Sequence, residues 1–497
     1  MYISTRGGEE QLTAAQAILK GIAGNGGLYV PEDIPAIDHT WIANLQEMNY
    51  CERAQAVLNL FLTDYNADEL DACIQAAYSA DKFDHSEVAP VVKLDAGSYI
   101  LELWHGPTSA FKDMALQLLP HLLSLSLEKT GEDAQIVILV ATSGDTGKAA
   151  LEGFKDVKQI RMIVFYPQDG VSEIQRLQMV TQEGNNVAVV AVTGNFDDTQ
   201  TGVKQIFNDT AFNAQLAEEG YQFSSANSIN WGRLVPQIVY YFSAYADMLK
   251  QGAIEAGEKV NFVVPTGNFG NILAGYYAYL MGLPINKLIC AANSNNVLAD
   301  FLQTGCYDRK REFHKTLSPS MDILISSNLE RLLYHLTGEN AGQVSEWMKE
   351  LNEKGSYQVS EPVLADLQHL FWADWASDSQ TTETIAAVHE TFGYTCDPHT
   401  AVAWGVCEKY RAQTADQTKA VILSTASPFK FNTSVVSALQ GSSDSADEFV
   451  ILEQLSQLSG WPIPRQLAAL EQKQRLHYIA CKPQEMAKTV QEILNNK

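Results

Sequence analysis

One repeated pattern constrains the fold of this chain most strongly: a short apolar run, a turn rich in Gly, Ser and Thr, and then a helical stretch. The clearest unit is QIVILVA at 135–141, which is followed by TSGDTG and KAALEGF. Similar apolar runs stand at 161–167, 187–192, 261–265, 288–293 and 420–426, and SYILELWH at 98–105 is a further predicted strand. Apolar runs of about five to seven residues between helical patterns are typical of buried parallel strands. The sequence therefore predicts an α/β protein with more than one doubly wound parallel sheet.

The regions that flank this pattern are mainly helical. A chain of 497 residues is long enough for two or three domains. We expect a helical N-terminal domain over 1–95, an α/β core over 96–440 and a C-terminal tail over 441–497. Within the core we expect a smaller subdomain at about 113–225 and a helical insertion at about 300–395.

The charge of the chain argues against a broad nucleic-acid or anionic-membrane surface. It has 34 basic and 59 acidic residues, a net charge of −25, whereas nucleic acids and anionic membranes require clustered cations. The N-terminus lacks the pattern of a secretion signal, and no apolar run reaches the length of a membrane-spanning helix. We therefore expect a soluble cytoplasmic protein that binds neither nucleic acid nor membranes, and that binds any phosphate or carboxylate through a local site.

Cysteine and histidine usage gives no indication of a metal site. The seven cysteines include no CxxC pair, and the ten histidines show no HExxH motif. A disulfide framework, a structural zinc site and a metallohydrolase are therefore not expected.

The stretch HGPTSAFKD at 105–113 places a lysine where a helix should begin. Thr108 or Ser109 could cap this helix, so that Lys112 lies in its first turn. The helix dipole disfavours a cation there by roughly 0.3–1 kcal/mol. A neutral or covalently occupied amine is correspondingly favoured. Position alone favours a simpler alternative, an exposed lysine whose charge is offset by Asp113.

A second candidate site is the turn after the strand at 135–141. It consists of Ser143, Gly144, Asp145, Thr146 and Gly147. Backbone N–H groups of small residues can converge on an anion here, and two hydroxyls add donors. The turn is not a nucleotide-binding P-loop, because Thr142 replaces the first glycine and Ala149 replaces the hydroxyl that would hold magnesium. An ordinary tight turn in which Asp145 caps the helix fits equally well.

The third candidate site is the loop after the strand at 261–265. It consists of Gly267, Asn268, Phe269, Gly270 and Asn271. Two glycines three residues apart at a strand end favour a phosphate at the following helix N-terminus. Phe269 stands where the dinucleotide fingerprint requires a glycine, which argues against NAD.

Seven motifs together resemble one enzyme family. HGPTSAFKD, ATSGDTG, NSINWGR, PTGNFGN, DPHTA and TASPFKF occur in the order seen in the threonine synthase family of pyridoxal-phosphate enzymes, and NGGLYVP is similar to that family's N-terminal domain. The motifs extend from near the start of the chain to residue 431. The resemblance implies fold type II, with two doubly wound parallel-sheet domains and a mainly helical N-terminal domain.

The resemblance also implies roles for individual residues. Lys112 would form the covalent link to the cofactor, and Thr425 would face its pyridine nitrogen. The cofactor-binding residues would be Lys112, Gly267, Asn268, Phe269, Gly270, Asn271 and Thr425. The substrate carboxylate would be bound by Ser143, Gly144, Asp145, Thr146 and Gly147, and the substrate phosphate by Asn227, Ser228 and Arg233.

The implied reaction converts O-phospho-L-homoserine and water to L-threonine and phosphate, with Lys112 as the catalytic base. Another fold type II lyase or dehydratase that acts on a hydroxy- or phospho-amino acid is an alternative. A non-catalytic phosphate- or nucleotide-binding protein is more distant. Of the remaining motif residues, His399 could face the site, although Asp397-Pro398 is also an ordinary helix start. We expect a small-molecule substrate, no metal, and a monomer or homodimer.

Overall fold

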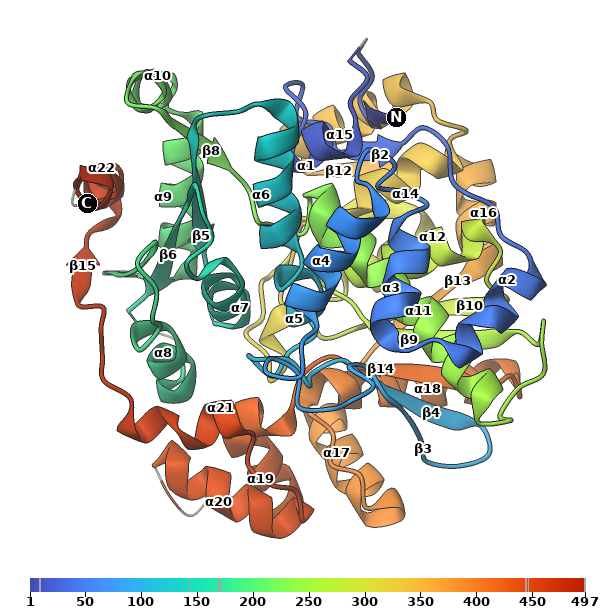
Figure 1. The fold of residues 1–497 in the computed structure, drawn as a ribbon. Helices are drawn as coiled ribbons and strands as arrows, with labels where there is room; N and C mark the ends of the chain where they lie inside the picture. Colours follow the sequence, from blue (N-terminus) through green and yellow to red (C-terminus); the bar gives the residue numbers. More distant parts are fainter. Residues whose placement is uncertain (9, 143, 169–170, 443–444, 446, 496–497) are drawn as a thin grey trace.

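Two large sheets, each covered by helices on both faces, form the centre of the protein (Figure 1). The computed structural model describes all residues except 9, 143, 169–170, 443–444, 446 and 496–497. The predicted class is confirmed: the protein is α/β, with two doubly wound, largely parallel sheets and a mainly helical N-terminal domain.

The larger sheet has the strand order β13-β10-β9-β14-β4-β3 and is parallel except for β3, which pairs antiparallel with β4. Its strands are β3 Val91–Lys93, β4 Ser98–Glu102, β9 Val260–Pro265, β10 Ile285–Ala292, β13 Phe371–Trp375 and β14 Ala420–Ser424. Phe262 packs in the same cluster as the helices α11 (Trp231–Lys250) and α12 (Gly270–Met281), whereas the next residue, Val263, packs with α18 (Pro398–Thr414). Because side chains alternate along a strand, these helices cover opposite faces.

The smaller sheet has the order β15-β7-β6-β5-β8 and is entirely parallel. Its strands are β5 Gln135–Ala141, β6 Ile160–Pro167, β7 Val187–Val192, β8 Tyr221–Ser224 and β15 Ile479–Cys481. The helices around it are α7 Asp145–Phe154, α8 Glu173–Val180, α9 Phe196–Asn208, α10 Thr210–Glu218 and α22 Met486–Asn495. At the left of Figure 1 the C-terminal segment runs beside this sheet, where β15 pairs with β7.

The N-terminal domain begins with an antiparallel pair, β1 (Tyr2–Ser4) and β2 (Tyr29–Pro31). Its helices are α1 Ala14–Lys20, α2 His39–Asn44, α3 Tyr50–Leu58 and α4 Ala67–Ala77. Three of them start with a capping box, in which a Thr or Asn side chain and a Gln or Glu three residues later satisfy each other's backbone N–H groups. The domain packs on the core through α1 against α6 (Leu119–Thr130) and α3 against α11.

The remaining elements surround the larger sheet and the C-terminal region. They are α5 Asp113–Leu116, α13 Val297–Thr304, β11 Cys306–Asp308, η2 Pro319–Met321, α14 Leu329–Leu336, α15 Ala341–Lys354, β12 Ser356–Gln358, α16 Glu361–Leu370, α17 Asp378–Phe392, η3 Pro428–Phe431, α19 Asn432–Gln440, α20 Glu448–Ser459, α21 Arg465–Ala468, η4 Leu470–Gln472 and η5 Pro483–Glu485. A short 3-10 turn in the N-terminal domain, η1, spans Leu45–Glu47. Among the described residues, no helix is long and apolar enough to cross a membrane.

Four strands of the two sheets, β3, β8, β13 and β15, are not predicted by the sequence. They are three to five residues long, and β13 and β15 lie in regions whose pattern is mainly helical. The expected domain boundaries stay predictions. Two elements join sheets across them: β13 from the expected insertion pairs with β10, and β15 from the expected tail pairs with β7.

Candidate active site

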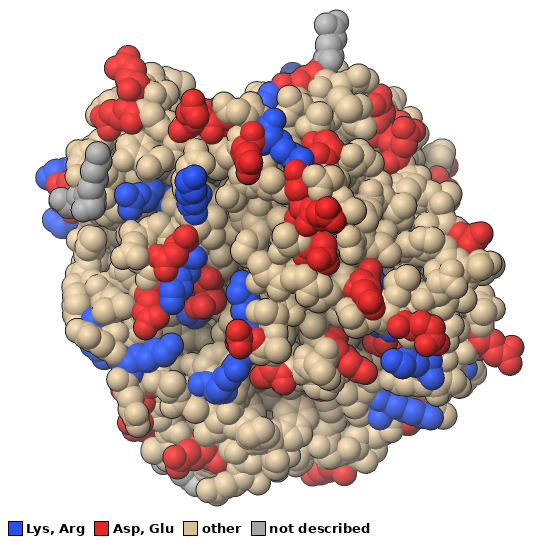
Figure 2. All heavy atoms as spheres, viewed as in Figure 1, with Lys and Arg blue, Asp and Glu red and all other residues tan. Residues whose placement is uncertain are grey.

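The loops that follow strands of both sheets carry the predicted site residues: those of Lys112 and Gly267 belong to the larger sheet, and those of Asp145 and Ser228 to the smaller one. The segment that carries Lys112 is held at the end of β14, because Phe111 N–H donates to Thr425 O (2.8 Å) and Ala110 forms a bridge with Ala426. Ligands of open α/β sheets bind at this carboxyl end of the strands. On the face in Figure 2, Lys and Arg side chains gather over the smaller sheet and around the hollow between the sheets, although the chain is acidic.

Lys112 precedes a single turn of helix rather than lying inside a long one. α5 spans only Asp113–Leu116, and Pro120 lies in the first turn of the next helix, α6. The expected cap by Thr108 or Ser109 is wrong: the residue at the cap position is Lys112 itself, without a side-chain cap. Ser109 instead adopts a left-handed backbone (φ 56°), which belongs to the turn that leads into Lys112.

The Lys112 amine lies in a site that favours its neutral form. Burial is the main reason that its pKa falls to about 8, and the charges of Lys430 and Arg233 lower it further, while Asp145 opposes the shift. Nζ donates a hydrogen bond to Ser320 Oγ at 3.2 Å. An amine with this pKa is uncharged in a useful fraction of molecules near neutral pH, which suits covalent attachment and proton transfer.

Asp113 does not form an ion pair with Lys112. Its carboxylate accepts hydrogen bonds from Thr108 N–H (2.7 Å) and Thr108 Oγ1 (2.8 Å). The side chain is completely buried, and burial raises its pKa to about 6. The simpler explanation of Lys112, an exposed lysine offset by its neighbour, is therefore not what the structure shows.

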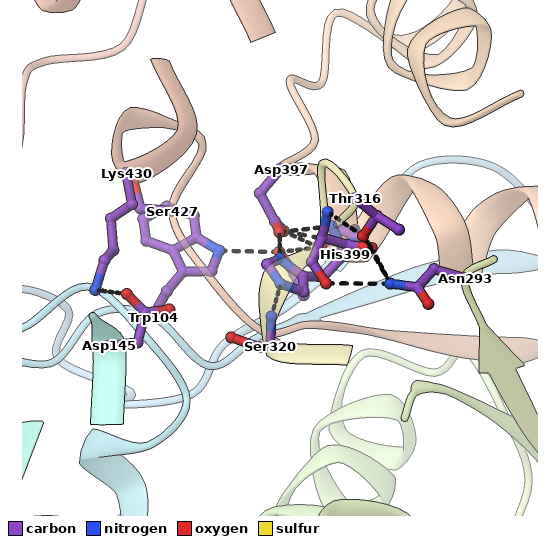
Figure 3. A network of polar contacts seen from close by, with 12 residues as sticks. Trp104, Asp145, Asn293, Thr316, Ser320, Asp397, His399, Ser427 and Lys430 are labelled. Atoms are coloured by element: carbon purple, nitrogen blue, oxygen red, sulfur yellow. Dashed lines mark hydrogen bonds and ion pairs between the residues drawn. The ribbon is translucent and has the colours of Figure 1, made fainter. Parts of the chain in front are cut away.

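The turn before α7 forms a buried ion pair with Lys430 from the segment Pro428–Phe431. Asp145 Oδ1 lies 2.6 Å from Nζ of Lys430, and both side chains are almost fully buried (Figure 3). Although burial raises it, the Lys430 and Lys112 charges hold the pKa of Asp145 well below its usual range. Gly144 and Gly147 N–H groups both donate to Thr142 Oγ1 at 3.0 Å, whereas the amides of Asp145 and Thr146 at the helix start have no partner among the described residues. The predicted Ser143 lies outside the described residues.

The loop from Gly267 to Asn271 turns directly into the N-terminus of α12. Phe269 at the cap position is left-handed (φ 62°) and gives no side-chain cap. Asn271 is buried; its Oδ1 accepts from Tyr240 Oη at 2.6 Å, but its Nδ2 has no partner among the described residues. A Cβ on Gly267 would lie 2.6 Å from Ser320 O, so only glycine fits there. Free helix amides beside an unpaired amide nitrogen form a suitable anion site.

The predicted phosphate segment before α11 is held by two buried arginines. Arg233 donates from Nη1 to Ala226 O, and its Nε has no partner among the described residues. Arg331 donates from Nη2 to Ile229 O at 2.6 Å. Neither guanidinium contacts a carboxylate of the described chain, and burial lowers the pKa of each to about 10. Asn227 and Ser228 lie between the two anchored carbonyls.

Asn328 links this phosphate segment to the α12 loop. Its Nδ2 donates to Ser228 Oγ (3.2 Å) and to Asn268 O (3.0 Å). Its Oδ1 accepts from Arg331 Nη1 at 2.6 Å, which fixes the orientation of the amide. Arg331 in turn reaches Tyr29 O of the N-terminal domain at 2.9 Å. One buried arginine therefore joins the N-terminal domain to both candidate phosphate loops.

The motif DPHTA both starts a helix and contributes a side chain to the site. Asp397 caps α18 by accepting from His399 N–H (2.9 Å) and Thr400 N–H (3.3 Å), so the helix-start interpretation is confirmed. The His399 ring nevertheless reaches the site: Nδ1 lies 2.7 Å from Asp397 Oδ1, and Nε2 lies 3.2 Å from Ser320 N (Figure 3).

Sequence reasoning did not single out Ser320, Asn328, Arg331 or Lys430. Lys430 lies inside the motif TASPFKF, and this position is the one sequence signal for its role in the site. The other three lie in the region expected to be a helical accessory, and their neighbours in sequence show no motif. Among the described residues, no group of His, Cys, Asp and Glu is arranged to hold a metal ion.

Comparison with known proteins identifies the family. The profile "Threonine synthase N terminus" matches residues 1–78, "Pyridoxal-phosphate dependent enzyme" matches 83–361 and "Threonine synthase, C-terminal" matches 400–490. A threonine synthase of Pseudomonas aeruginosa is 43% identical, over 88% of this chain and 90% of that protein. The chain belongs to the threonine synthase family. It is thereby a pyridoxal-phosphate-dependent enzyme, and its cofactor is pyridoxal phosphate.

Solved structures of the threonine synthase family share the fold along the whole chain. The pyridoxal-phosphate-bound threonine synthase of Brucella melitensis is 37% identical, with a TM-score of 0.87 and 99% of each chain covered. Threonine synthase-like 1 of Homo sapiens is 42% identical over 86% of this chain. The chain spans 58–63% of the length of that relative and of three similar ones.

Proposed function

We propose that this member of the threonine synthase family converts O-phospho-L-homoserine and water to L-threonine and phosphate. The observation that carries the proposal is the buried Arg233, which has an unpartnered Nε and no carboxylate contact in the described chain. A buried guanidinium without a counter-charge is costly unless an anion completes it. A substrate phosphate supplies that anion with the two oxygens that a planar donor fork requires.

The residues of the site fit pyridoxal phosphate. Its phosphate would be held by the free amides at the start of α12 and by Asn271 Nδ2, and Lys112 would form the covalent link. Thr425, at the end of β14, would face the pyridine nitrogen. When bound, the cofactor delocalises the negative charge that remains on carbon after a proton has been removed.

Lys112 is the residue that we infer moves the proton. Its amine is close to half neutral near pH 8, so that it can accept a proton from the substrate Cα and return one later. The nearby Lys430 and Arg233 charges favour the unprotonated form. The same amine would serve at Cβ when phosphate leaves from Cγ and water adds.

The substrate carboxylate would bind at the start of α7. The amides of Asp145 and Thr146 point from a helix N-terminus, where an anion is favoured. Lys430 neutralises the Asp145 carboxylate, so that a second carboxylate can approach without like-charge repulsion. Ser143 would complete this contact set, and Gly144 and Gly147, whose N–H groups donate to Thr142 Oγ1, would shape the turn around the carboxylate.

One experiment separates this function from another fold type II lyase or dehydratase. Purified protein is incubated with O-phospho-L-homoserine or with L-serine, and phosphate, threonine and keto acids are quantified. We expect threonine and phosphate in equal amounts from the first substrate. Keto acid from serine, without phosphate release from O-phosphohomoserine, would favour the alternative and refute the proposal.

A second experiment tests the role of Lys112. Lys112→Ala should abolish turnover while cofactor phosphate binding persists, and Lys129→Ala, a change of a lysine outside the site, should be neutral. Turnover by Lys112→Ala would contradict the assignment. The cytoplasmic location, the monomeric or homodimeric state, and the absence of nucleic-acid and membrane binding stay predictions.

A further inference from the structure

The Lys112 amine is the end of a chain of hydrogen bonds that runs through three residues outside the predicted site set. Nζ donates to Ser320 Oγ at 3.2 Å, and Ser320 N–H donates to His399 Nε2 at 3.2 Å. His399 Nδ1 lies 2.7 Å from Asp397 Oδ1, and the Asp397 side chain is completely buried. Figure 3 shows the Ser320, His399 and Asp397 part of this chain.

The geometry fixes the tautomer of His399. A backbone N–H can only donate, so Nε2 of the ring must be the acceptor and carry no proton. The proton is then on Nδ1 and points at the Asp397 carboxylate. Asp397 is itself held, because it also accepts from the backbone N–H of His399 and of Thr400 at the start of α18. The imidazole is therefore a neutral, rigid acceptor for the Ser320 backbone.

A second anchor holds the same segment from β10. Asn293 Nδ2 donates to Thr316 Oγ1 (2.8 Å), Ser318 Oγ (2.9 Å) and Asp322 Oδ1 (2.8 Å). Asn293 directly follows β10, and His399 is in the first turn of α18. The turn that contains Ser320 is thus fixed from two elements of the larger sheet domain, and its hydroxyl has a defined position.

We propose that Ser320 and His399 are positioning residues for the Lys112 amine: Ser320 Oγ orients the free amine, and His399, held by Asp397, orients Ser320. The inference rests on the proposed role of Lys112 in binding the cofactor. A free lysine side chain has many rotamers, and an acceptor at the site restricts them. Because the amine donates to Ser320, its nitrogen lone pair stays available to attack the cofactor aldehyde or to take a proton.

The test uses the rate at which full-length apoenzyme regains its cofactor. The amine condenses with the aldehyde of pyridoxal phosphate and one water is released; the product is reduced with borohydride and the Lys112 peptide is quantified by mass spectrometry. Ser320→Ala should slow this step by roughly threefold to tenfold, as expected for the loss of one neutral hydrogen bond. Ser126→Ala removes a buried hydroxyl from α6, where it donates to Leu122 O, without contact to Lys112 or to the Ser320 turn, and should change the rate by less than about twofold.

A second ligand distinguishes positioning from general loosening of the site. Pyridoxamine phosphate has the ring and the phosphate but no aldehyde, so its binding does not use the Lys112 amine as a nucleophile. Its dissociation constant should be unchanged in Ser320→Ala. In turnover, kcat should fall while KM for O-phosphohomoserine stays within about twofold. Equal weakening of both cofactor forms would show a merely structural role and overturn the inference.

The proposed role of His399 in orienting Ser320 is tested by a double-mutant cycle. His399→Leu should slow attachment about as much as Ser320→Ala, and the double variant should be no slower than either, because both act on one contact. His399→Gln retains an acceptor oxygen and should recover part of the rate; it also serves if His399→Leu does not fold. Additive effects would overturn the His399 role.

Failure of this inference can be told apart from failure of the proposed function. If the reduced wild-type protein carries the pyridoxyl group on a residue other than Lys112, the proposed function fails at its central residue. If Lys112 is labelled in the wild type and Ser320→Ala attaches the cofactor at the wild-type rate, the positioning inference alone fails.

Discussion

Removing the imidazole of His105 is expected to destabilise the protein in a strongly pH-dependent way. His105 lies where HGPTSAFKD begins, with Nδ1 2.7 Å from Asp84 Oδ1 and Nε2 2.8 Å from Glu102 Oε2. Both ring nitrogens thus face carboxylate oxygens, and each needs a proton to form its hydrogen bond. Tyr394 Oη donates to the other oxygen of Glu102 at 2.9 Å, so the network joins the end of β4 to two distant segments.

The magnitude follows from the pKa. Burial alone would lower the pKa of His105, but the hydrogen bonds to Asp84 and Glu102 outweigh it and raise the pKa to about 9, from an ordinary value near 6.5. Each pKa unit corresponds to about 1.4 kcal/mol, which gives roughly 3 kcal/mol, or about 2 kcal/mol once water screening at the 33% exposed Asp84 side chain is included. Because the folded-state pKa is the higher one, this contribution is complete below about pH 6.5 and is lost as the pH rises through about 9.

The assay compares wild type with His105→Gln by urea unfolding at about pH 6 and about pH 9.5. The difference in unfolding free energy between the two proteins should shrink by about 2–3 kcal/mol between these pH values. Gln303→Ala is the control: its amide carries no ionisable group and donates to Ala373 O at 2.8 Å, so the corresponding difference should not change with pH. A wild-type advantage of the same size at both pH values would refute a cationic His105.

Three further predictions concern residues of the site and their effects on substrate affinity, cofactor affinity and stability. Arg233→Lys should raise KM for O-phosphohomoserine by roughly tenfold or more with a smaller change in kcat, because an ammonium cannot donate to two phosphate oxygens; unchanged steady-state KM would contradict phosphate binding by Arg233. Gly267→Ala should weaken pyridoxal phosphate binding in fluorescence titrations, since the new Cβ would lie 2.6 Å from Ser320 O and the α12 loop must shift; wild-type affinity would exclude that loop as the phosphate site. Lys430→Met should lower the free energy of unfolding, measured by urea denaturation, by roughly 3 kcal/mol or more, because Asp145 stays buried without its ion-pair partner. Adding Asp145→Asn should recover much of this loss, and no recovery would show that the two residues are not coupled.

The parts of the fold that the sequence predicts are those set by local pattern. The strands β5, β6, β7, β9, β10 and β14 are apolar runs flanked by turns, and each is present. β15 is three residues long, and two of them, Ile479 and Ala480, are exposed at the edge of the sheet. Such a strand owes its position to pairing with β7, almost 300 residues earlier in the chain, and no local pattern records that pairing.

The same distinction applies to the site. Lys112, the Gly267 loop and Arg233 stand in motifs whose residue types suggest their chemistry. Ser320 is an ordinary serine in a proline-containing loop, 208 residues from the lysine whose amine it contacts. Arg331 occupies a helix that sequence alone presents as amphipathic, yet it is fully buried and uses its three nitrogens on Tyr29, Ile229 and Asn328.

Residues of this second kind act on the reactive groups through the backbone of other segments, and this explains why motifs miss them. Arg331 donates to two main-chain carbonyls, and His399 accepts from a main-chain amide. Every residue type has a main-chain N–H or C=O group, so the residue that supplies this group can be of almost any type. The sequence therefore contains no pair of residue types that would reveal the contact. What it does require is a defined backbone position, which only the packed sheet and its loops supply. The motifs therefore predict the chemistry of the site. The geometry that directs the Lys112 amine depends on contacts that form only after the larger sheet and the N-terminal domain have assembled.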